Sequence, residues 1–462
     1  MRPAGGASSL FFIEFALLCA LLAGGARAEA APRAGIAHES PLETRIDLAT
    51  VLRLAGAQNL EIQIARQRLE EARARHRIAV QEFFPWLAPG FVYRRHDGLT
   101  QATEGEIIDV HKHAYATGAG IAAQADVGPA IFRSRETGKL AIAAERLFDA
   151  QRSDALLAAV EGYFDLARAQ AAVGVAEDAA RIARDYERQL QRAVEIGLAL
   201  KGEALRVRAR AERAELERRQ SLVARRTAAA RLAETLSLDP SVVLVAADEE
   251  LVPISVVDEG ASLESLLSQA FVARPELRAA DAVLAAAGDA KDGAVIGPLI
   301  PSLGASAFLG GLGGGPRDFA GQFGGSRDYA LTIHWRIGPG GLFDPGRVQA
   351  ARARLEAACL ETERTSRRVR KEVVEAWTKA RSLAEQIDTA KQGLEAAQET
   401  LRLSAERREF GIAAVLEHVL AEQDLTRARH DYVTAVAEHD KAQYALLRAI
   451  GSGPEAASSR GR

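Results

Sequence analysis

The sequence predicts a mainly α-helical fold with a β-barrel part, built from two copies of one structural unit. Three observations predict it. The 462-residue chain matches itself at a shift of about 215 residues, a period that indicates a duplicated domain. No proline occurs between Pro129 and Pro240 or between Pro345 and Pro454, and both stretches are rich in good helix formers. Four short segments alternate apolar and polar residues, as strands do.

The N-terminus has the features of a secretory signal. Leu10 to Ala23 is mostly apolar, and small residues follow at the positions that precede a cleavage site. Residues 1–28 are therefore predicted to be a signal peptide, cut after Ala28 or Ala30. Lipidation of Cys19 is disfavoured, because leucine precedes it where a small residue is expected.

The mature sequence holds no run of about 18 or more apolar residues, which argues against a transmembrane helix. Two alternatives remain, a protein soluble in the periplasm or one that crosses a membrane as a β-barrel. Positive and negative charges nearly balance, with 59 lysines and arginines against 62 aspartates and glutamates. Nucleic acid is therefore not an expected partner.

Each half is predicted to repeat the same order of elements. The first structural repeat spans 44–239 and the second spans 262–451, with a linker at 240–261 and a flexible tail at 452–462. In each repeat a short helix, starting near 44 or 262, comes before a second helix. A pair of extended segments and two very long helices complete the repeat.

The very long helices are the strongest local prediction. Apolar residues recur along them at steps of three and four, which predicts coiled-coil packing. A helix over 137–196 would be roughly 90 Å long, at about 1.5 Å per residue. Glycine interrupts each long helical stretch once, at Gly197 and Gly411, where we expect the tips of two helical hairpins.

Four extended segments are predicted as strands, near 85–95, 115–127, 301–310 and 329–338. In the last of these, apolar residues share one parity and polar or small residues the other, so that one face is apolar. We expect this apolar face to contact lipid. Its residues are Tyr329, Leu331, Ile333, Trp335 and Ile337.

The strand count predicts an oligomer. Four strands cannot close a barrel, and an open sheet edge is untenable in lipid, so neighbouring chains must complete it. Three chains would give twelve strands. The residues between paired strands, His96 to Lys112 and Gly310 to Gly325, are predicted to be external loops. The alternative is a small antiparallel sheet with one face on a core, but the long helices offer no core for it to cover.

The sequence indicates no catalytic site, so no enzyme and no cofactor are predicted. His111 and His113 could bind a metal, but no cysteine or carboxylate pair is fixed beside them, and a metal site is disfavoured. The glycines at 311–315 lack the lysine and hydroxyl residue of a phosphate-binding loop.

Taken together, these marks resemble the TolC-like outer membrane efflux protein family over about 44–451. The openings of the second helices read GAQN and VARPEL, and strand entries contain proline. No single mark is specific to this family, but the order of the marks is specific, because it occurs in both halves of the chain. Beside those openings, the marks are Pro85 and Pro301 at the strand entries, Tyr163 and Trp377 on the first long helices, and Gly197 and Gly411 at the hairpin tips.

The resemblance implies a homotrimer with a twelve-stranded barrel in the outer-membrane lipid and a twelve-helix tunnel in the periplasm. It implies the channel of a tripartite efflux or secretion system, which passively conducts substrates from a periplasmic adaptor and an inner-membrane transporter to the exterior. A soluble periplasmic coiled-coil adaptor or structural protein is the alternative. The sequence identifies neither the cargo nor the pump.

The resemblance also assigns roles to residues at the tips. The adaptor is expected to contact Gly197, Leu198, Ala199, Gly411, Ile412 and Ala413. Glu417, six positions after the second glycine, is expected to form a ring of three carboxylates that narrows the periplasmic end. Leu420 stands where the family often has a second acidic residue, so one ring is expected, and not two.

Overall fold

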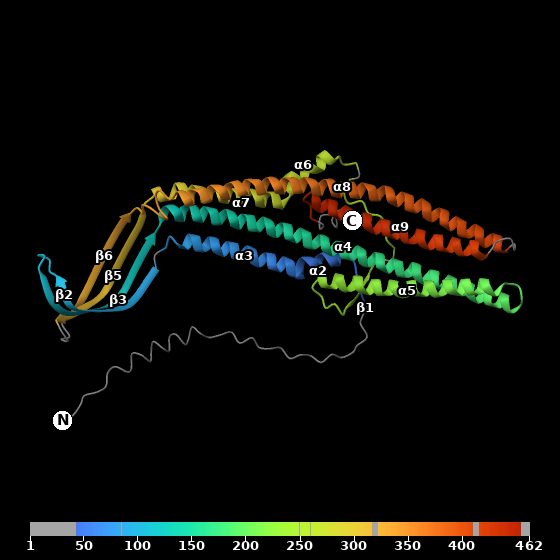
Figure 1. Ribbon diagram of the computed structural model, residues 1–462, viewed down its shortest axis with the longest axis horizontal. Helices are drawn as coiled ribbons and strands as arrows, with labels where there is room; N and C mark the ends of the chain where they lie inside the picture. The colour runs from blue at the N-terminus through green and yellow to red at the C-terminus, as the bar shows by residue number, and fades with distance from the viewer. Residues whose placement is uncertain are drawn as a thin grey trace, which may run out of the picture. The chain divides into compact units, whose positions relative to one another are not determined.

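The structure is a computed structural model that describes residues 43–84, 86–248, 250–258, 260–316, 322–409 and 415–453. The predicted signal peptide and residues 454–462 of the predicted tail lie outside these ranges. Within the described ranges the chain is mostly helical with a smaller sheet part, as predicted (Figure 1).

The first half of the chain begins with a short strand and ends with a long helical hairpin. Its elements are β1 (Glu43–Ile46), α2 (Leu48–Gln58), α3 (Leu60–Gln81), β2 (Trp86–Gln101), β3 (Ile107–Ala125), α4 (Val127–Glu195) and α5 (Lys201–Thr235). β4 (Val243–Ala246) follows within the linker and pairs in parallel with β1. This pairing was not predicted, because each strand has only four residues and the two lie about 200 positions apart.

The second half repeats the order of the first. Its elements are α6 (Leu263–Ala273), α7 (Pro275–Val295), the short 3₁₀-helix η1 (Gly297–Leu299), β5 (Ser302–Pro316), β6 (Gln322–His334), α8 (Pro345–Glu409) and α9 (Val415–Ala449). β2, β3, β5 and β6 form one antiparallel sheet in that order, with β2 and β6 at its edges.

The long helix of the first half starts earlier than predicted. α4 has 69 residues and begins at Val127, ten positions before the expected start at 137. Pro129 does not prevent this, because it lies in the first turn, where backbone N–H groups have no partner within the helix. At about 1.5 Å per residue, α4 is roughly 100 Å long.

The strands are longer than predicted, and the expected external loops are correspondingly shorter. β2 and β3 remain paired as far as Gln101 and Ile107, so His96 and Lys112 are partners in a ladder and not the ends of a loop. β5 extends to Pro316 and β6 begins at Gln322, inside the predicted loop at 310–325. At its other end, β6 stops at His334, four residues short of the prediction.

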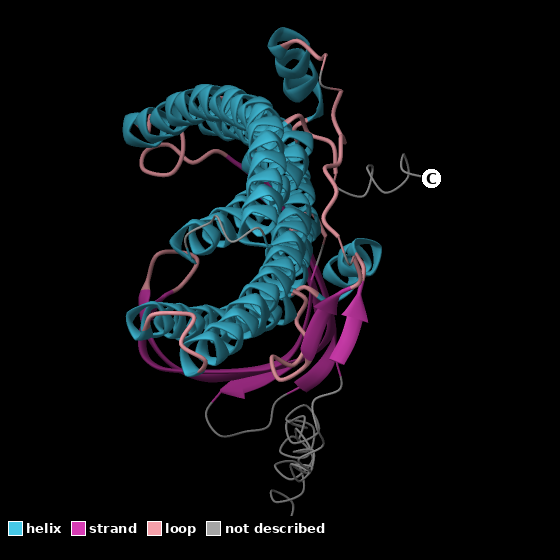
Figure 2. Ribbon diagram, turned by 90° about the vertical axis from the view of Figure 1, so that its right-hand side faces the viewer, coloured by secondary structure: helices cyan, strands magenta, loops and turns pink. Residues whose placement is uncertain are grey.

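The long helices form a curved layer when viewed end-on, and short helices lie beside it (Figure 2). Near the sheet, α4 packs against α3 and α7, and α7 packs against α8. Toward the hairpin tips, α4 packs against α5 and α9, and α9 packs against α8. α4 and α8 therefore run through both parts of the layer, and the predicted hairpins α4–α5 and α8–α9 lie side by side. None of the described helices is both long enough and apolar enough to span a membrane.

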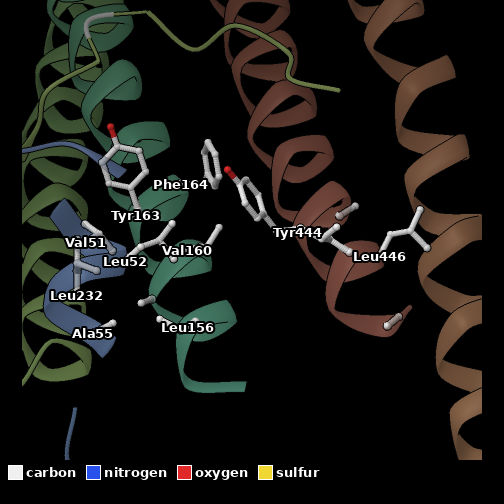
Figure 3. Packing of buried hydrophobic residues seen from close by; sticks show 14 of the residues in the cluster. Val51, Leu52, Ala55, Leu156, Val160, Tyr163, Phe164, Leu232, Tyr444 and Leu446 are labelled. Carbon is white, nitrogen blue, oxygen red and sulfur yellow. The ribbon is translucent and has the colours of Figure 1, made fainter. Parts of the chain in front are cut away.

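The main hydrophobic core lies midway along α4, where the two halves meet (Figure 3). Val51 and Leu52 of α2, Val160 of α4 and Leu232 of α5 are almost fully buried there. Phe164 contacts Tyr444 of α9, with ring centroids 6.0 Å apart. Burial of such side chains contributes about 1.5–3 kcal/mol each.

Polar contacts fasten the linker to one face of the helical layer. The Tyr163 hydroxyl donates to Asp248 at 2.5 Å, and burial together with this bond raises the pKa of Tyr163. The Gln170 side chain exchanges two hydrogen bonds with the backbone of Ala246. Farther along, the Asp440 carboxylate accepts from the Ile254 N–H at 3.0 Å, and its burial raises its pKa. The linker thus contacts both α4 and α9.

In each half, a side chain at the start of the second helix donates a hydrogen bond to a carbonyl at the end of the hairpin's last helix. The two halves use different residues for this contact. In the first half, the Asn59 side chain caps α3 and donates to the Thr235 carbonyl at the end of α5, at 2.7 Å. In the second half, Arg274 precedes α7 and its Nη1 donates to the Ala449 carbonyl at the end of α9, at 3.4 Å. Each contact satisfies a carbonyl that a helix end leaves without an intrahelical partner.

Candidate functional site

One face of the four-stranded sheet is apolar and exposed. On β6, Tyr329, Leu331 and Ile333 are 73%, 76% and 56% exposed, and they share a face because they alternate along the strand. The register places Leu309, Ala307 and Leu303 of β5 beside this face. Trp335 and Ile337, also predicted to face lipid from the strand, are exposed but lie beyond its end. The opposite face of the inner strands β3 and β5 carries mainly glycine, alanine and serine.

A row of aromatic side chains crosses the apolar face at one height. Tyr93, Tyr115, Gly313 and Phe323 are partners in successive ladders from β2 to β6. The rings of Tyr115 and Phe323 stack 5.8 Å apart, the Tyr115 ring over Gly313 and the Phe323 ring over Gly311. A Cβ atom at Gly313 would stand 2.6 Å from the Tyr115 ring, so glycine is required beneath it. Aromatic girdles of this kind lie at the membrane–water interfaces of outer-membrane proteins.

A second aromatic residue bounds the apolar stretch at the other end. Trp335 follows β6, and its indole N–H donates to the Leu299 carbonyl at 3.2 Å. Phe323 and Trp335 are twelve positions apart, about 40 Å along an extended chain. With a strand tilt of about 45°, that span crosses roughly 28 Å, close to the hydrocarbon thickness of a bilayer.

The outer part of β2 and β3 is polar on the same face. His111 lies 3.2 Å from Asp97 and 3.9 Å from Asp109, and His113 stacks on Tyr115. Hydrogen bonds from Arg95 and His111 lower the pKa of Asp97. No three His, Cys, Asp or Glu side chains in the described part of the chain are arranged to hold a metal ion.

The first hairpin tip is closed by a left-handed glycine. α4 ends at Glu195, and Gly197 has a φ of +77°. The Leu198 N–H donates to the Ala193 carbonyl at 2.8 Å and the Gly197 N–H to Val194 at 3.1 Å, the two bonds of a Schellman motif. Leu198 is 79% exposed, and its neighbours Ile196 and Leu200 are also exposed, so the tip presents apolar side chains to its surroundings.

Replacing Gly197 with alanine is expected to destabilise the protein by about 1–2 kcal/mol, because L-residues avoid this backbone conformation. No atom lies within 4 Å of the added methyl group, so strain is the whole effect. The matched control is Gly202→Ala within α5, where space is also open and φ is not positive. That change should stabilise by about 0.5–1 kcal/mol. Thermal unfolding measures both; equal effects would contradict the role of Gly197.

The second hairpin tip is only partly described. Gly411, Ile412 and Ala413 lie outside the described residues, between the end of α8 and the start of α9. Glu417 lies in the first turn of α9, half exposed, and its carboxylate is 3.0 Å from the Arg407 guanidinium of α8. The predicted gate carboxylate therefore has a cationic partner within its own hairpin.

A buried polar cluster near this tip was missed in the sequence. The His418 ring lies 3.0 Å from the Ser404 hydroxyl and 3.2 Å from the Glu422 carboxylate, and all three come from α8 and α9. Tyr186 of α4 packs edge-on against His418, with centroids 5.4 Å apart. The cluster thus joins the two hairpins. The only signal in the sequence was a histidine and a glutamate four positions apart, which share a helix face.

Comparisons with known proteins agree with this geometry. The family model described as "Outer membrane efflux protein" matches residues 266–452. The Campylobacter jejuni CmeC outer membrane channel is similar in structure, with a TM-score of 0.76 and 17% identity over 94% of this chain and 96% of that one. VceC from Vibrio cholerae has a TM-score of 0.73 and 20% identity over 88% and 96% of the two chains.

A third similar structure is the open state of the Neisseria gonorrhoeae MtrE outer membrane channel. Its TM-score is 0.70, at 19% identity over 88% of this chain and 89% of that one. No match was found among the curated proteins. The matched family and these similar structures are outer-membrane proteins. The second half of the chain thus matches the outer membrane efflux protein family model, and most of the chain shares the fold of these outer membrane channels.

Proposed function

We propose that three copies of this chain form an outer-membrane channel that passively conducts substrates outward in a tripartite efflux or secretion system. The observation that carries the proposal is the open four-stranded sheet, which has one apolar face and two free edges and continues directly into helices roughly 100 Å long. In lipid, the N–H and C=O groups of both edges need partners.

The strand directions support closure between copies. Successive strands in the sheet are antiparallel, so β2 and β6 run in opposite directions at the two edges. β6 of one copy can therefore pair antiparallel with β2 of the next. Such a head-to-tail contact generates a ring when the rotation closes. Three copies give twelve strands, an even number, as is usual in bacterial outer-membrane barrels.

The hairpins supply the rest of the conduit and its contact with partners. Three curved layers placed side by side would enclose a tunnel below the barrel. The tips would then meet a periplasmic adaptor that couples the channel to an inner-membrane transporter. The exposed Ile196, Leu198 and Leu200 support a contact of this kind, because exposed apolar clusters mark interaction sites.

The test is conductance of the purified protein in a planar lipid bilayer. Discrete, stable current steps are expected of a channel, and detergent should be required to extract the protein from outer membranes. The alternative, a soluble periplasmic adaptor, predicts release by osmotic shock and no current, and that result would refute the proposal.

Replacing Glu417 with alanine is expected to weaken the preference for cations, because a ring of carboxylates concentrates cations in a narrow pore. Reversal potentials in a salt gradient measure the change. Glu361→Ala is the matched control, since Glu361 is also an exposed helix carboxylate with an arginine partner, at 2.9 Å. An unchanged reversal potential for the Glu417 variant would contradict the proposed carboxylate ring.

A further inference from the structure

A groove with basic walls lies between the two hairpins, in the part that runs from the main hydrophobic core to the hairpin tips. Its floor is formed by small residues of α4, and its volume is about 480 Å³, within the range of sites for small molecules. Arg210 and Arg213 of α5 line one wall, and Arg427 and His430 of α9 line the other. Glu217 is the one carboxylate in the lining. Three guanidinium groups therefore share the groove with a single negative charge.

The three arginines differ from their neighbours in having no ion-pair partner. Among the described residues, no carboxylate lies within 4.0 Å of Arg210, Arg213 or Arg427 in any ion pair. Several other arginines at this level of the hairpins are paired. Arg184, Arg218 and Arg219 all contact Glu215, and hydrogen bonds from the latter two hold its pKa at about 2.

Two other arginines, Arg181 and Arg429, lie on the face of the helical layer opposite the groove. Ala172 of the groove floor follows Tyr163 by nine positions, about 2.5 turns, so it points away from the face that holds the linker. Arg181 follows Tyr163 by 18 positions, about five turns, and so lies on the linker face. There it pairs with Asp178 at 2.8 Å, and Arg429 of α9 also contacts Asp178 at 3.6 Å.

The duplication places matching charges on both walls of the groove. Arg213 and Arg427 are equivalent positions of the two repeats, 214 residues apart, and they reach the same space from α5 and α9. Because all lining residues come from one chain, each copy in an oligomer would carry its own groove. In the proposed trimer, the face away from the linker lines the tunnel.

We propose that this groove binds amphipathic organic anions, with a sulfonate or carboxylate held by the arginines and a ring system resting on the floor formed by Ala172, Val175 and Ala176. Guanidinium groups bind planar or tetrahedral oxyanions through paired N–H donors. Contact between the ring system of the ligand and the small floor residues buries apolar surface, which adds to the binding free energy. The inference rests on the proposed channel function, and it names a class of solute that the channel would take up on its way outward.

The test is equilibrium dialysis of the full-length protein in non-ionic detergent with naphthalene-2-sulfonate as the probe. Saturable binding at one site per chain is expected, weakening as salt is raised because added ions screen the arginines. Arg213→Gln combined with Arg427→Gln should lower the affinity at least about tenfold, since hydrogen bonds to charged groups are the strong ones. The uncharged analogue 2-naphthalenemethanol should bind much more weakly than the sulfonate.

The matched control combines Arg181→Gln with Arg429→Gln, which removes the same charge from the same layer on its other face. This variant should bind the probe with the affinity of the unchanged protein. Any of three results would overturn the proposal. These are an equal loss of affinity in both double variants, an unchanged affinity in the groove variant, or equal affinities for the sulfonate and its uncharged analogue. Dialysis needs no conducting pore, so a failure here is distinct from a failure of the channel proposal, which bilayer currents test separately.

Discussion

Replacing Arg274 with methionine is expected to lower the free energy of unfolding by about 3–5 kcal/mol, the usual cost of removing one partner from a buried ion pair. The Arg274 side chain is 1% exposed. Its guanidinium contacts the carboxylates of Glu276, at 3.1 Å, and Glu372. Without it, these two carboxylates would share Arg448, which already pairs with Asp154 at 2.5 Å.

The cluster explains why the loss should be large. Arg274 precedes α7, Glu372 lies on α8, Arg448 on α9 and Asp154 on α4, so the ion pairs join four helices where the repeats meet. The Glu276 and Arg448 side chains are only 11% and 15% exposed, so little water reaches the centre of the cluster. Removing Arg274 also leaves the Ala449 carbonyl without the donor that closes the end of α9.

The measurement is urea unfolding of the detergent-solubilised protein, followed by circular dichroism at a fixed protein concentration. Arg364→Met is the matched control, because Arg364 is an exposed arginine of α8 whose one ion pair among the described residues is with Glu361, three positions away. Its loss should change stability by less than about 1 kcal/mol. Similar midpoints for the two variants would show that the buried cluster contributes little.

Replacing Leu331 with lysine is expected to destabilise the membrane-inserted protein by about 2–4 kcal/mol per chain, the cost of a cation near the middle of a bilayer. Leu331 lies at the centre of the apolar stretch of β6, between Tyr329 and Ile333, and is 76% exposed. Guanidinium unfolding from lipid vesicles measures the loss, which should also reduce the yield of protein in the outer membrane.

Thr332→Lys is the control for this substitution. Thr332 is the next residue on the same strand and therefore points to the opposite face, which carries small residues. A lysine there should cost less than about 1 kcal/mol if that face lines an aqueous channel. If the two lysines are equally tolerated, the apolar face does not contact lipid.

The long helices and the apolar strand segments could be predicted because their signals are local. Proline-free stretches of good helix formers and a glycine at a hairpin tip need no knowledge of distant partners. The strand ends could not be found in this way. On β2, Arg95 and Asp97 continue the parity of Phe91 and Tyr93 beyond the aromatic row, so apolar alternation stops while backbone pairing goes on. Gly310 to Gly315 has no side-chain pattern at all, and its partner strands set its register.

The contacts that join the two halves also could not be predicted from the sequence. Arg274 stood in a recognised motif, yet its partners Glu372 and Arg448 are about 100 and 170 positions away, so nothing local marked the ion cluster. The Ser404–His418 contact and the unpaired arginines of the groove likewise depend on which helices lie side by side. Long-range packing, and not local propensity, decides these features.

Cross-linking between the two free edges of the sheet tests the proposed assembly most directly. Cysteines would be placed at Phe91 or Tyr93 of β2 and at Tyr329 or Leu331 of β6, after Cys359, which is exposed, is replaced with serine. Cysteines at Ala119 and Leu309, which are partners within one sheet, serve as the control that links only inside a chain. With a short bifunctional maleimide, we expect edge-to-edge bonds that give one, two and three linked chains and nothing larger. Chains that stay unlinked and remain soluble without detergent, or a series that continues beyond three, would contradict the closed trimer.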